Sequence, residues 1–216
     1  MAIVGDVGSG KSSLLSCLTG EMVQVGGQGV VSVSGSLAYA PQTPWILNSS
    51  LRNNVTFGKT YFEKYYRQVL KACGLDIDCN LLAANDMTEI GEKGSNLSGG
   101  QKQRVSLARA IYSNSDVILL DDPLSSVDAK LAKSIFDEVI GPNGMTKTKT
   151  RLLVTSDLGL LKHTDMVIVM KNGSVEQAGT FDEIQKSKSE LAQLLSIHSA
   201  GSDQDQEGTS RVTYFC

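Results

Sequence analysis

The chain has 216 residues, of which 41% are apolar, enough to bury the core of one domain with or without a small appendage. Its formal net charge of −3 gives no electrostatic basis for binding nucleic acid. Four cysteines without CxxC spacing indicate reduced thiols, His163 and His198 lie too far apart to suggest a zinc site, and no apolar run approaches the roughly 20 residues that cross a bilayer.

The first half of the chain begins with a strand and a glycine-rich turn. A buried strand is predicted at Met1–Val4, and a helix at about Lys11–Leu18. Alternating apolar residues between turn glycines predict two short paired strands, at about Gly29–Val33 and Ser36–Tyr39. The segment from Ser50 to about Ser95 reads as helical and polar.

The second half continues to alternate strands and helices. Ser98 is expected to cap a helix at about Gln101–Tyr112. The elements predicted after it are a strand (Val117–Leu120), a helix (about Asp128–Ile140), a strand (Arg151–Thr155), a hairpin (Met166–Met170 with Ser174–Gln177, turning at Asn172-Gly173), and a last helix with a Thr180/Glu183 capping box and an apolar side of Ile184, Leu191, Leu194 and Leu195. This alternation predicts an α/β fold with a largely parallel sheet.

A phosphate-binding loop is predicted between the first strand and the first helix. Residues Gly5 to Ser12 read GDVGSGKS and match the pattern G-x-x-x-x-G-K-[ST] in full. Glycines let successive backbone N–H groups turn toward phosphate oxygens, and the following helix presents its positive end to the same anion. Lys11 can reach the outer phosphates, and the Ser12 hydroxyl can ligate Mg²⁺. The residues predicted to bind nucleotide here are Gly5, Asp6, Val7, Gly8, Ser9, Gly10, Lys11, Ser12 and Ser13.

Two further runs carry candidate chemistry. The run VILLDD ends a strand in two acids, and a phosphate-binding loop needs an acid at a neighbouring strand tip to hold Mg²⁺, so we assign Asp121 to the metal. In the run NLSGGQKQR, Ser98 and the two glycines after it stand where a helix begins, a second candidate anion site, although a lone Ser-Gly-Gly is more often a plain turn. Two phosphate-type sites are unusual for a kinase or GTPase, but are expected if two such domains close over shared nucleotides.

The order of these runs resembles the ATP-binding cassette of ABC transporters. The matching runs are GDVGSGKS, APQ with Gln42, LSGGQ, VILLDD and SSVD, and the resemblance covers about Ala2 to Ser196. Finer runs such as TPWILNSSLRNNVTFG and TEIGEKG are similar to the first cassette of multidrug-resistance-associated (subfamily C) exporters. The resemblance implies a P-loop NTPase fold with a mainly parallel core sheet, a small β subdomain and an α-helical signature subdomain at about 50–110. The domain would span 1–198, truncated at its N-terminus, with a disordered tail at 199–216.

The resemblance also implies a role for each motif, with ATP and Mg²⁺ as cofactors. Gln42 would contact the Mg²⁺ held by Ser12 and Asp121 and relay the state of the site to the transmembrane domains. Asp128 would cross the interface with a second nucleotide-binding domain, and Thr88–Gly94 matches a segment that exporters place against their coupling helices. The residues that would meet ATP bound by the second domain are Leu97, Ser98, Gly99, Gly100 and Gln101.

Two positions depart from the family pattern. Asp122 stands where an efficient cassette has a glutamate that orients or deprotonates the attacking water, and a side chain shorter by roughly 1 Å can cost about 10²-fold in rate. Aspartate here is itself typical of the first cassette of the resembled exporters. Ser156 stands where the family has a histidine that contacts the γ-phosphate. With Lys11 as the third catalytic residue, we expect tight ATP binding and slow hydrolysis, unless the serine hydroxyl and water substitute fully.

The resemblance implies an ATP-hydrolysing domain of an exporter of organic anions, conjugates or drugs, on the cytosolic face of a plasma, vacuolar or lysosomal membrane. A non-catalytic ATP-dependent interaction module, or a truncated isoform without transport activity, is the alternative. A cassette acting on ribosomes or in DNA repair is disfavoured by the TEIGEKG run. Relatives carry strands and an adenine-stacking aromatic residue before the loop, so we expect a fragment, a short isoform or an incomplete gene model.

Overall fold

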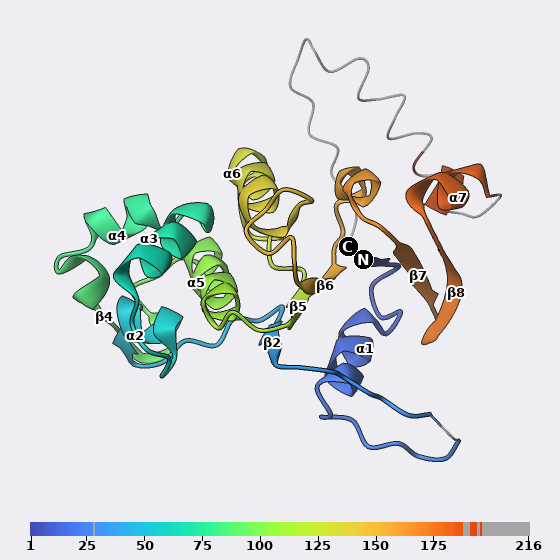
Figure 1. The fold of residues 1–216 in the computed structure, drawn as a ribbon, viewed down its shortest axis with the longest axis horizontal. Coiled ribbons are helices and arrows are strands. Elements are labelled where there is room, and N and C mark those ends of the chain that lie inside the picture. Colours follow the sequence, from blue (N-terminus) through green and yellow to red (C-terminus); the bar gives the residue numbers. More distant parts are fainter. Residues whose placement is uncertain (28, 188–190, 194, 196–216) are drawn as a thin grey trace, which may run out of the picture.

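The computed structural model describes residues 1–27, 29–187, 191–193 and 195. Within these residues, one larger sheet carries helices on its two faces, and a group of helices extends to one side (Figure 1). The predictions for Leu194, His198 and the tail at 199–216 lie outside the described residues.

The larger sheet is mainly parallel, as the alternation of strands and helices predicts. Its six strands, among the described residues, are β1 (Ala2–Val4), β2 (Leu37–Ala40), β5 (Val117–Asp121), β6 (Thr150–Val154), β7 (Val167–Lys171) and β8 (Ser174–Gly179). The spatial order is β2-β5-β6-β1-β7-β8, and only the β7–β8 pair of this order is antiparallel. The β7–β8 pair confirms the hairpin predicted from Asn172-Gly173, where Asn172 and Gly173 both have positive φ.

The helices lie between and beside these strands. They are α1 (Lys11–Leu18), α2 (Leu51–Thr56), α3 (Glu63–Ala72), α4 (Asp76–Leu81), α5 (Gly99–Tyr112), α6 (Ala129–Ile135) with a π-helical end η3 (Phe136–Ile140), and α7 (Phe181–Lys186), with the 3₁₀ turns η1 (Asn85–Met87), η2 (Glu92–Gly94) and η4 (Leu158–His163). The predicted bounds of α1 are confirmed, and Ser98 caps α5 in a capping box with Gln101. The predicted capping box of α7, between Thr180 and Glu183, is also confirmed.

Each strand of the core presents alternate residues to the two faces of the sheet. On one face, Leu15 of α1 packs with Ile3 and Leu119. On the other face, Leu107 and its neighbours on α5 pack in one cluster with Ile118 and Leu120 of β5. Helices α1 and α5 therefore lie on opposite faces of the same sheet. Successive side chains of a strand point to opposite faces, so a strand that is apolar at every position is buried by helices on both sides.

The prediction of a strand at Gly29–Val33 is wrong. Residues 29–36 form no strand, and Val30 is 89% exposed. A single extended segment without a hydrogen-bonded neighbour has no advantage over water-bonded coil. The second strand of the predicted pair, Ser36–Tyr39, exists with shifted bounds as β2, but it pairs in parallel with β5. The small antiparallel sheet is instead formed by β3 (Ser49–Ser50) and β4 (Glu89–Ile90).

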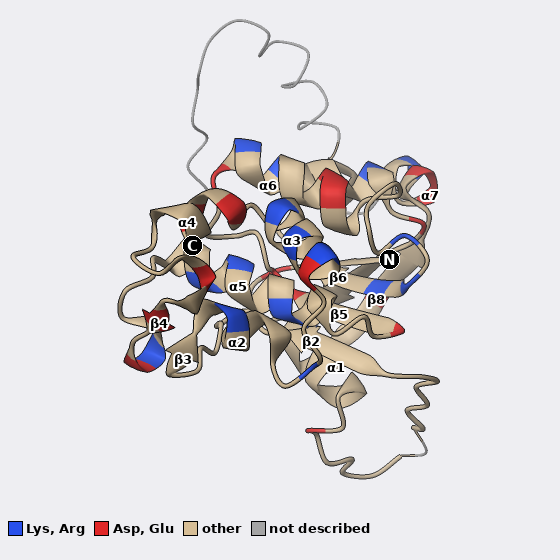
Figure 2. Ribbon diagram, turned by 60° about the vertical axis from the view of Figure 1, so that its left-hand side comes forward, with Lys and Arg blue, Asp and Glu red and all other residues tan. Residues whose placement is uncertain are grey.

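The surface of the described part mixes both signs of charge. Figure 2 shows basic and acidic segments interspersed over the helices α3 to α7. None of the helices that the structure describes combines the length and the apolar character needed to cross a bilayer.

A fully buried asparagine connects α2 and α5, and its loss is expected to destabilise the fold. The Asn54 amide oxygen accepts hydrogen bonds from the Leu47 N–H at 2.8 Å and the Arg109 guanidinium at 3.0 Å, and its amide nitrogen donates to the Ser50 carbonyl at 3.1 Å. Asn54→Ala removes a fully buried carboxamide and leaves the buried Ser50 carbonyl and the half-buried Leu47 N–H and Arg109 guanidinium without this partner. We therefore expect a loss of about 3 kcal/mol in the free energy of unfolding, measured by urea denaturation. The exposed neighbour Asn53→Ala is the control, with an expected loss below about 1 kcal/mol; equal losses would contradict the prediction.

Candidate nucleotide site

Four neighbouring parallel strands end at one edge of the larger sheet, and the predicted site residues follow them. Ala40 of β2 pairs with Leu120 of β5, Asp121 pairs with Val154 of β6, and Val154 pairs with Ile3 of β1. Because the carboxyl ends of parallel strands lie at the same edge, this register gathers four segments that are far apart in the sequence. They are Gln42, the Asp121–Asp122 pair, Ser156 and the loop from Gly5 to Lys11.

The loop after β1 is shaped by glycines and braced by the β7–β8 hairpin. A side chain on Gly5 would place its Cβ 2.1 Å from the Met170 carbonyl oxygen, so only glycine fits there. Gly8 and Gly10 have φ values of 81° and 98°, a conformation that glycine adopts without strain. The Gly173 N–H donates to the Ser9 carbonyl oxygen at 3.0 Å. The hairpin turn thus holds the loop in a fixed, tightly curved form.

The Lys11 side chain turns back over this loop. Its ammonium donates to the carbonyl oxygens of Gly5 and Asp6, both at 2.7 Å, and lies 3.5 Å from the Ser9 hydroxyl. It lies at the start of α1, where the helix end also favours an anion. The loop therefore presents one ammonium, curved backbone and a helix N-terminus to a single place, the arrangement that binds a chain of phosphates.

The residues present fit a magnesium ion. Asp121 is 2% exposed, and its carboxylate accepts a hydrogen bond from the Tyr39 hydroxyl at 3.4 Å. Burial, and then the neighbouring Asp121 charge, raise the pKa of Tyr39 to about 12, so the hydroxyl stays a donor at neutral pH. A buried carboxylate with one long hydrogen bond calls for a cation. The hydroxyl of Ser12, the carboxylate of Asp121 and the amide of Gln42 supply only oxygen donors, which suit Mg²⁺.

Asp122 and Ser156 line one cavity of about 470 Å³ between α6 and η4. Asp122 adopts a left-handed backbone with φ of 49°, and its N–H donates to the Val154 carbonyl at 3.0 Å. Burial, and then the Asp121 charge, raise the pKa of the Asp122 carboxyl, while the Ser156 backbone amide and the Lys11 charge oppose this shift. The two positions that depart from the family pattern thus face the same space.

The raised pKa of Asp122 predicts that this residue lowers the stability of the folded chain at neutral pH but not at acidic pH. Its carboxyl binds its proton more tightly in the folded chain than in the unfolded chain, where its ordinary value is 3.8. The contribution of this group to stability is therefore fully present below pH 3.8 and is lost as the pH rises through the folded-state pKa. We expect Asp122→Asn to be more stable than the wild type at pH 7, with the difference shrinking toward pH 4, in urea titrations at each pH. A constant difference would contradict this account.

The signature residues lie on α5, across the sheet from the loop. Gln101 accepts a hydrogen bond from the Ser98 N–H at 2.8 Å through its side-chain oxygen, and its amide nitrogen donates to Asp78 at 2.7 Å. Ser98 and Gly99 are exposed, and a side chain added at Gly99 would meet nothing within 4 Å. Asp128 caps α6 by accepting from the Leu131 N–H at 3.0 Å. Within one chain the two candidate anion sites are therefore separate.

Sequence reasoning missed three contributors to the site. Tyr39 contacts Asp121, Gly173 contacts the loop after β1, and Gln103 contacts the segment after Asp122. A period-two reading of β2 could have placed Tyr39 on the α1 face of the sheet, but nothing in the sequence gives the strand order that sets it beside β5.

Comparison with known proteins identifies related cassettes. A family model described as ABC transporter matches residues 1–125. The multidrug resistance protein mrp-7 of Caenorhabditis elegans is 53% identical over 207 residues, which is 96% of this chain. Human ATP-binding cassette sub-family C member 2 is 48% identical over 97% of the chain, and mouse sub-family C member 3 is 51% identical over 96%. The chain spans 13% of the length of each of these three relatives.

Proposed function

Because the chain belongs to the ABC transporter family, we propose that it is an ATP-binding and ATP-hydrolysing cassette of a sub-family C exporter, similar to the first of its cassettes. The observation that carries this proposal is the single sheet edge at which the phosphate loop, Asp121 and Gln42 meet. Bound Mg²⁺ would neutralise charge on the phosphate oxygens between Ser12 and Asp121. As the transported substrates we propose organic anions, conjugates or drugs, and of these classes only drugs appear in the name of a relative, the multidrug resistance protein.

The chain's own residues divide into those that bind and those that act on water. The loop amides and Lys11 hold the phosphates, and Tyr39 fixes one oxygen of Asp121. Asp122 is one methylene shorter than the glutamate of an efficient cassette, and Ser156 can donate and accept but cannot carry a positive charge. The site therefore favours holding ATP over hydrolysing it.

A second nucleotide-binding domain is the first partner that the surface fits. Ser98 and Gly99 are exposed at the start of a helix of 14 residues, on the opposite face of the sheet from the chain's own loop. Neither position departs from the family pattern, so this chain would complete the ATP site of its partner while its own site turns over slowly. Asp128, exposed at the start of α6, lies on the loop that we assign to the same interface.

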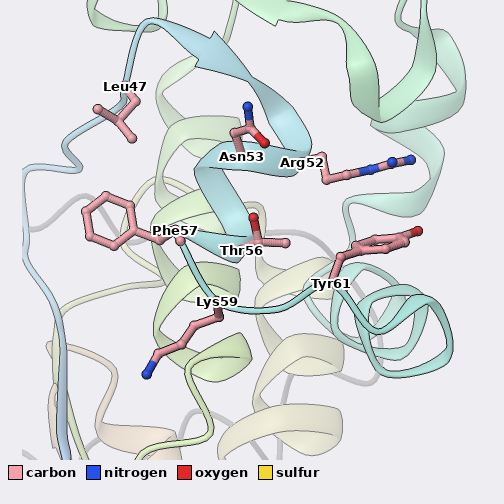
Figure 3. Close-up of a pocket in the computed structure, with 8 residues that line it drawn as sticks. Leu47, Arg52, Asn53, Thr56, Phe57, Lys59 and Tyr61 are labelled. Carbon is pink, nitrogen blue, oxygen red and sulfur yellow. The ribbon is translucent and has the colours of Figure 1, made fainter.

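The transmembrane domains are the second partner, and the proposed contact is the face around α2. A pocket of about 560 Å³ there is lined by Leu47 and Phe57 on one side and by Arg52 over the Tyr61 ring on the other (Figure 3). Trp45 beside it is 55% exposed. Exposed aromatic residues rimmed by charges are typical of protein contacts. The position of this cassette would then be the cytosolic face of a membrane.

The alternative is a non-catalytic module in which ATP only drives association. Phosphate release from MgATP by the whole chain, compared with Lys11→Ala, separates the two. We expect the wild type to exceed the variant, because Lys11 neutralises the phosphates that react. Turnover equal to that of Lys11→Ala, with ATP binding retained by the wild type, would favour the module.

A further inference from the structure

A buried glutamine side chain joins two loops that the proposed function treats separately. Gln103, on the second turn of α5, is 6% exposed. Its side-chain oxygen accepts from the Ser126 N–H at 3.0 Å. Its amide nitrogen donates to the Ser125 hydroxyl at 3.1 Å and to the Gln42 carbonyl oxygen at 3.4 Å. One carboxamide thus contacts the segment that ends at the metal site and the segment that ends at Asp128.

The segment 125–128 also packs directly on the signature end of α5. A Cβ added at Gly100 would lie 2.6 Å from the Ser126 carbonyl oxygen, so the two backbones are in close contact. Gly100 and Gln103 are three residues apart on one helix and share a face. A shift of the 125–128 segment must therefore also move the start of α5, where Ser98 and Gly99 are exposed.

Because the Gln103 side chain is buried, a change in one of its hydrogen bonds is expected to affect the others. The Gln103 carboxamide is itself buried, whereas Gln42, Ser125 and Ser126 are exposed, so a bond that is broken leaves an atom of Gln103 with little access to water. Moving one partner therefore imposes a cost on this side chain and on its other bonds. The bond to Gln42 is the longest of the three, and Gln42 is the residue assigned to the metal site. A displacement of the Gln42 backbone on nucleotide binding would therefore shift the Gln103 side chain and, through it, Ser125 and Ser126.

We propose that Gln103 is a positioning residue that couples nucleotide binding at Gln42 to the segment 125–128 and to the partner-facing start of α5. The inference rests on the proposed function, because it needs a nucleotide at the loop. In this proposal a residue outside the loop from Gly5 to Ser13 transmits the occupied state of the site to the surface that we assign to the second domain.

Hydrogen exchange of the whole chain, with and without MgATP, tests this coupling. In the wild type, MgATP should slow exchange in peptides covering 5–12 and 125–128. In Gln103→Met, which keeps the volume but removes the polar atoms, protection of 5–12 should persist. Protection of 125–128 should fall by about fivefold or more, the lower range of coupling between sites. Gln68→Met, the same change on the exposed face of α3, should behave as the wild type.

A second variant covers the case in which Gln103→Met does not fold. Gln103→Glu keeps the oxygen that accepts from Ser126 but loses the donors to Ser125 and Gln42, so it should lose the nucleotide dependence of 125–128 as well. Undiminished protection in either folded variant would overturn the inference. It would show that the segment senses nucleotide through Asp122, whose carbonyl accepts from the Ser125 hydroxyl at 3.0 Å. Failure of MgATP to protect 5–12 in the wild type would instead refute the proposed function, and the inference with it.

Discussion

Asp122→Glu combined with Ser156→His is expected to raise ATP hydrolysis by about 10²-fold, the cost that a misplacement of roughly 1 Å can impose. Both side chains line the same cavity of about 470 Å³, which gives the longer residues room. The glutamate would bring its carboxylate closer to an attacking water, and the histidine would add a contact to the γ-phosphate. Because the two residues act on one reacting centre, we expect each single variant to recover only part of the gain.

Phosphate release at saturating MgATP, with the partner cassette present, measures this gain. ATP affinity, measured by calorimetry on the same preparations, should change far less than turnover, since the loop and Lys11, to which we assign most of the phosphate contacts, are the same in both proteins. Lys11→Ala in the double-variant background is the control and should abolish the gain. Turnover unchanged in the double variant would mean that serine and water already do the work of the histidine.

Gly5→Ala is expected to abolish ATP binding and to destabilise the fold. Its Cβ would lie 2.1 Å from the Met170 carbonyl oxygen. The position of a Cβ is fixed by its own backbone and the carbonyl oxygen belongs to the backbone of β7, so no side-chain rotation can relieve this contact. Either the loop or β7 must move, and the loop amides then lose their common direction. We expect a loss of about 3 kcal/mol or more in the free energy of unfolding.

Gly20→Ala is the matched control for this change. Gly20 also has a positive φ, 81°, but an added Cβ there meets nothing within 4 Å and lies outside the loop. It should cost about 1–2 kcal/mol for the left-handed backbone alone and leave ATP binding intact. Urea denaturation and nucleotide titration measure the stability and the ATP affinity of both variants. Equal losses of stability and affinity in the two variants would show that the contact with Met170 is easily relieved.

Local structure is predicted best from the sequence where it depends on the conformational preference or hydrogen bonding of a single residue type. The bounds of α1, the Ser98 cap and the Asn172-Gly173 turn depend on neighbours within a few residues, and the structure confirms them. The alternation of strands and helices likewise predicts a mainly parallel sheet. The strand at Gly29–Val33 fails because alternation says only that a segment could pair, and no partner strand is present among the described residues.

The arrangement of the site could be predicted only in part. The motifs predict a phosphate-binding loop and an acid for Mg²⁺, because phosphate and Mg²⁺ each require particular groups, and both assignments stay predictions. The strand order β5-β6-β1, which sets Ser156 between the acids and the loop, depends on long-range packing that no short run encodes. For the same reason the contacts of Tyr39 and Gln103 were absent from the sequence-based prediction, since each joins residues more than twenty positions apart.

Isothermal titration of the whole chain with ATP, with and without Mg²⁺, tests the central claim most directly. The account predicts saturable binding that strengthens when Mg²⁺ is present and that Lys11→Ala removes, because the ammonium and the Asp121-bound metal share the phosphate charge. A folded chain that takes up no ATP in either condition, or binds it equally well with Lys11 replaced, would contradict the account.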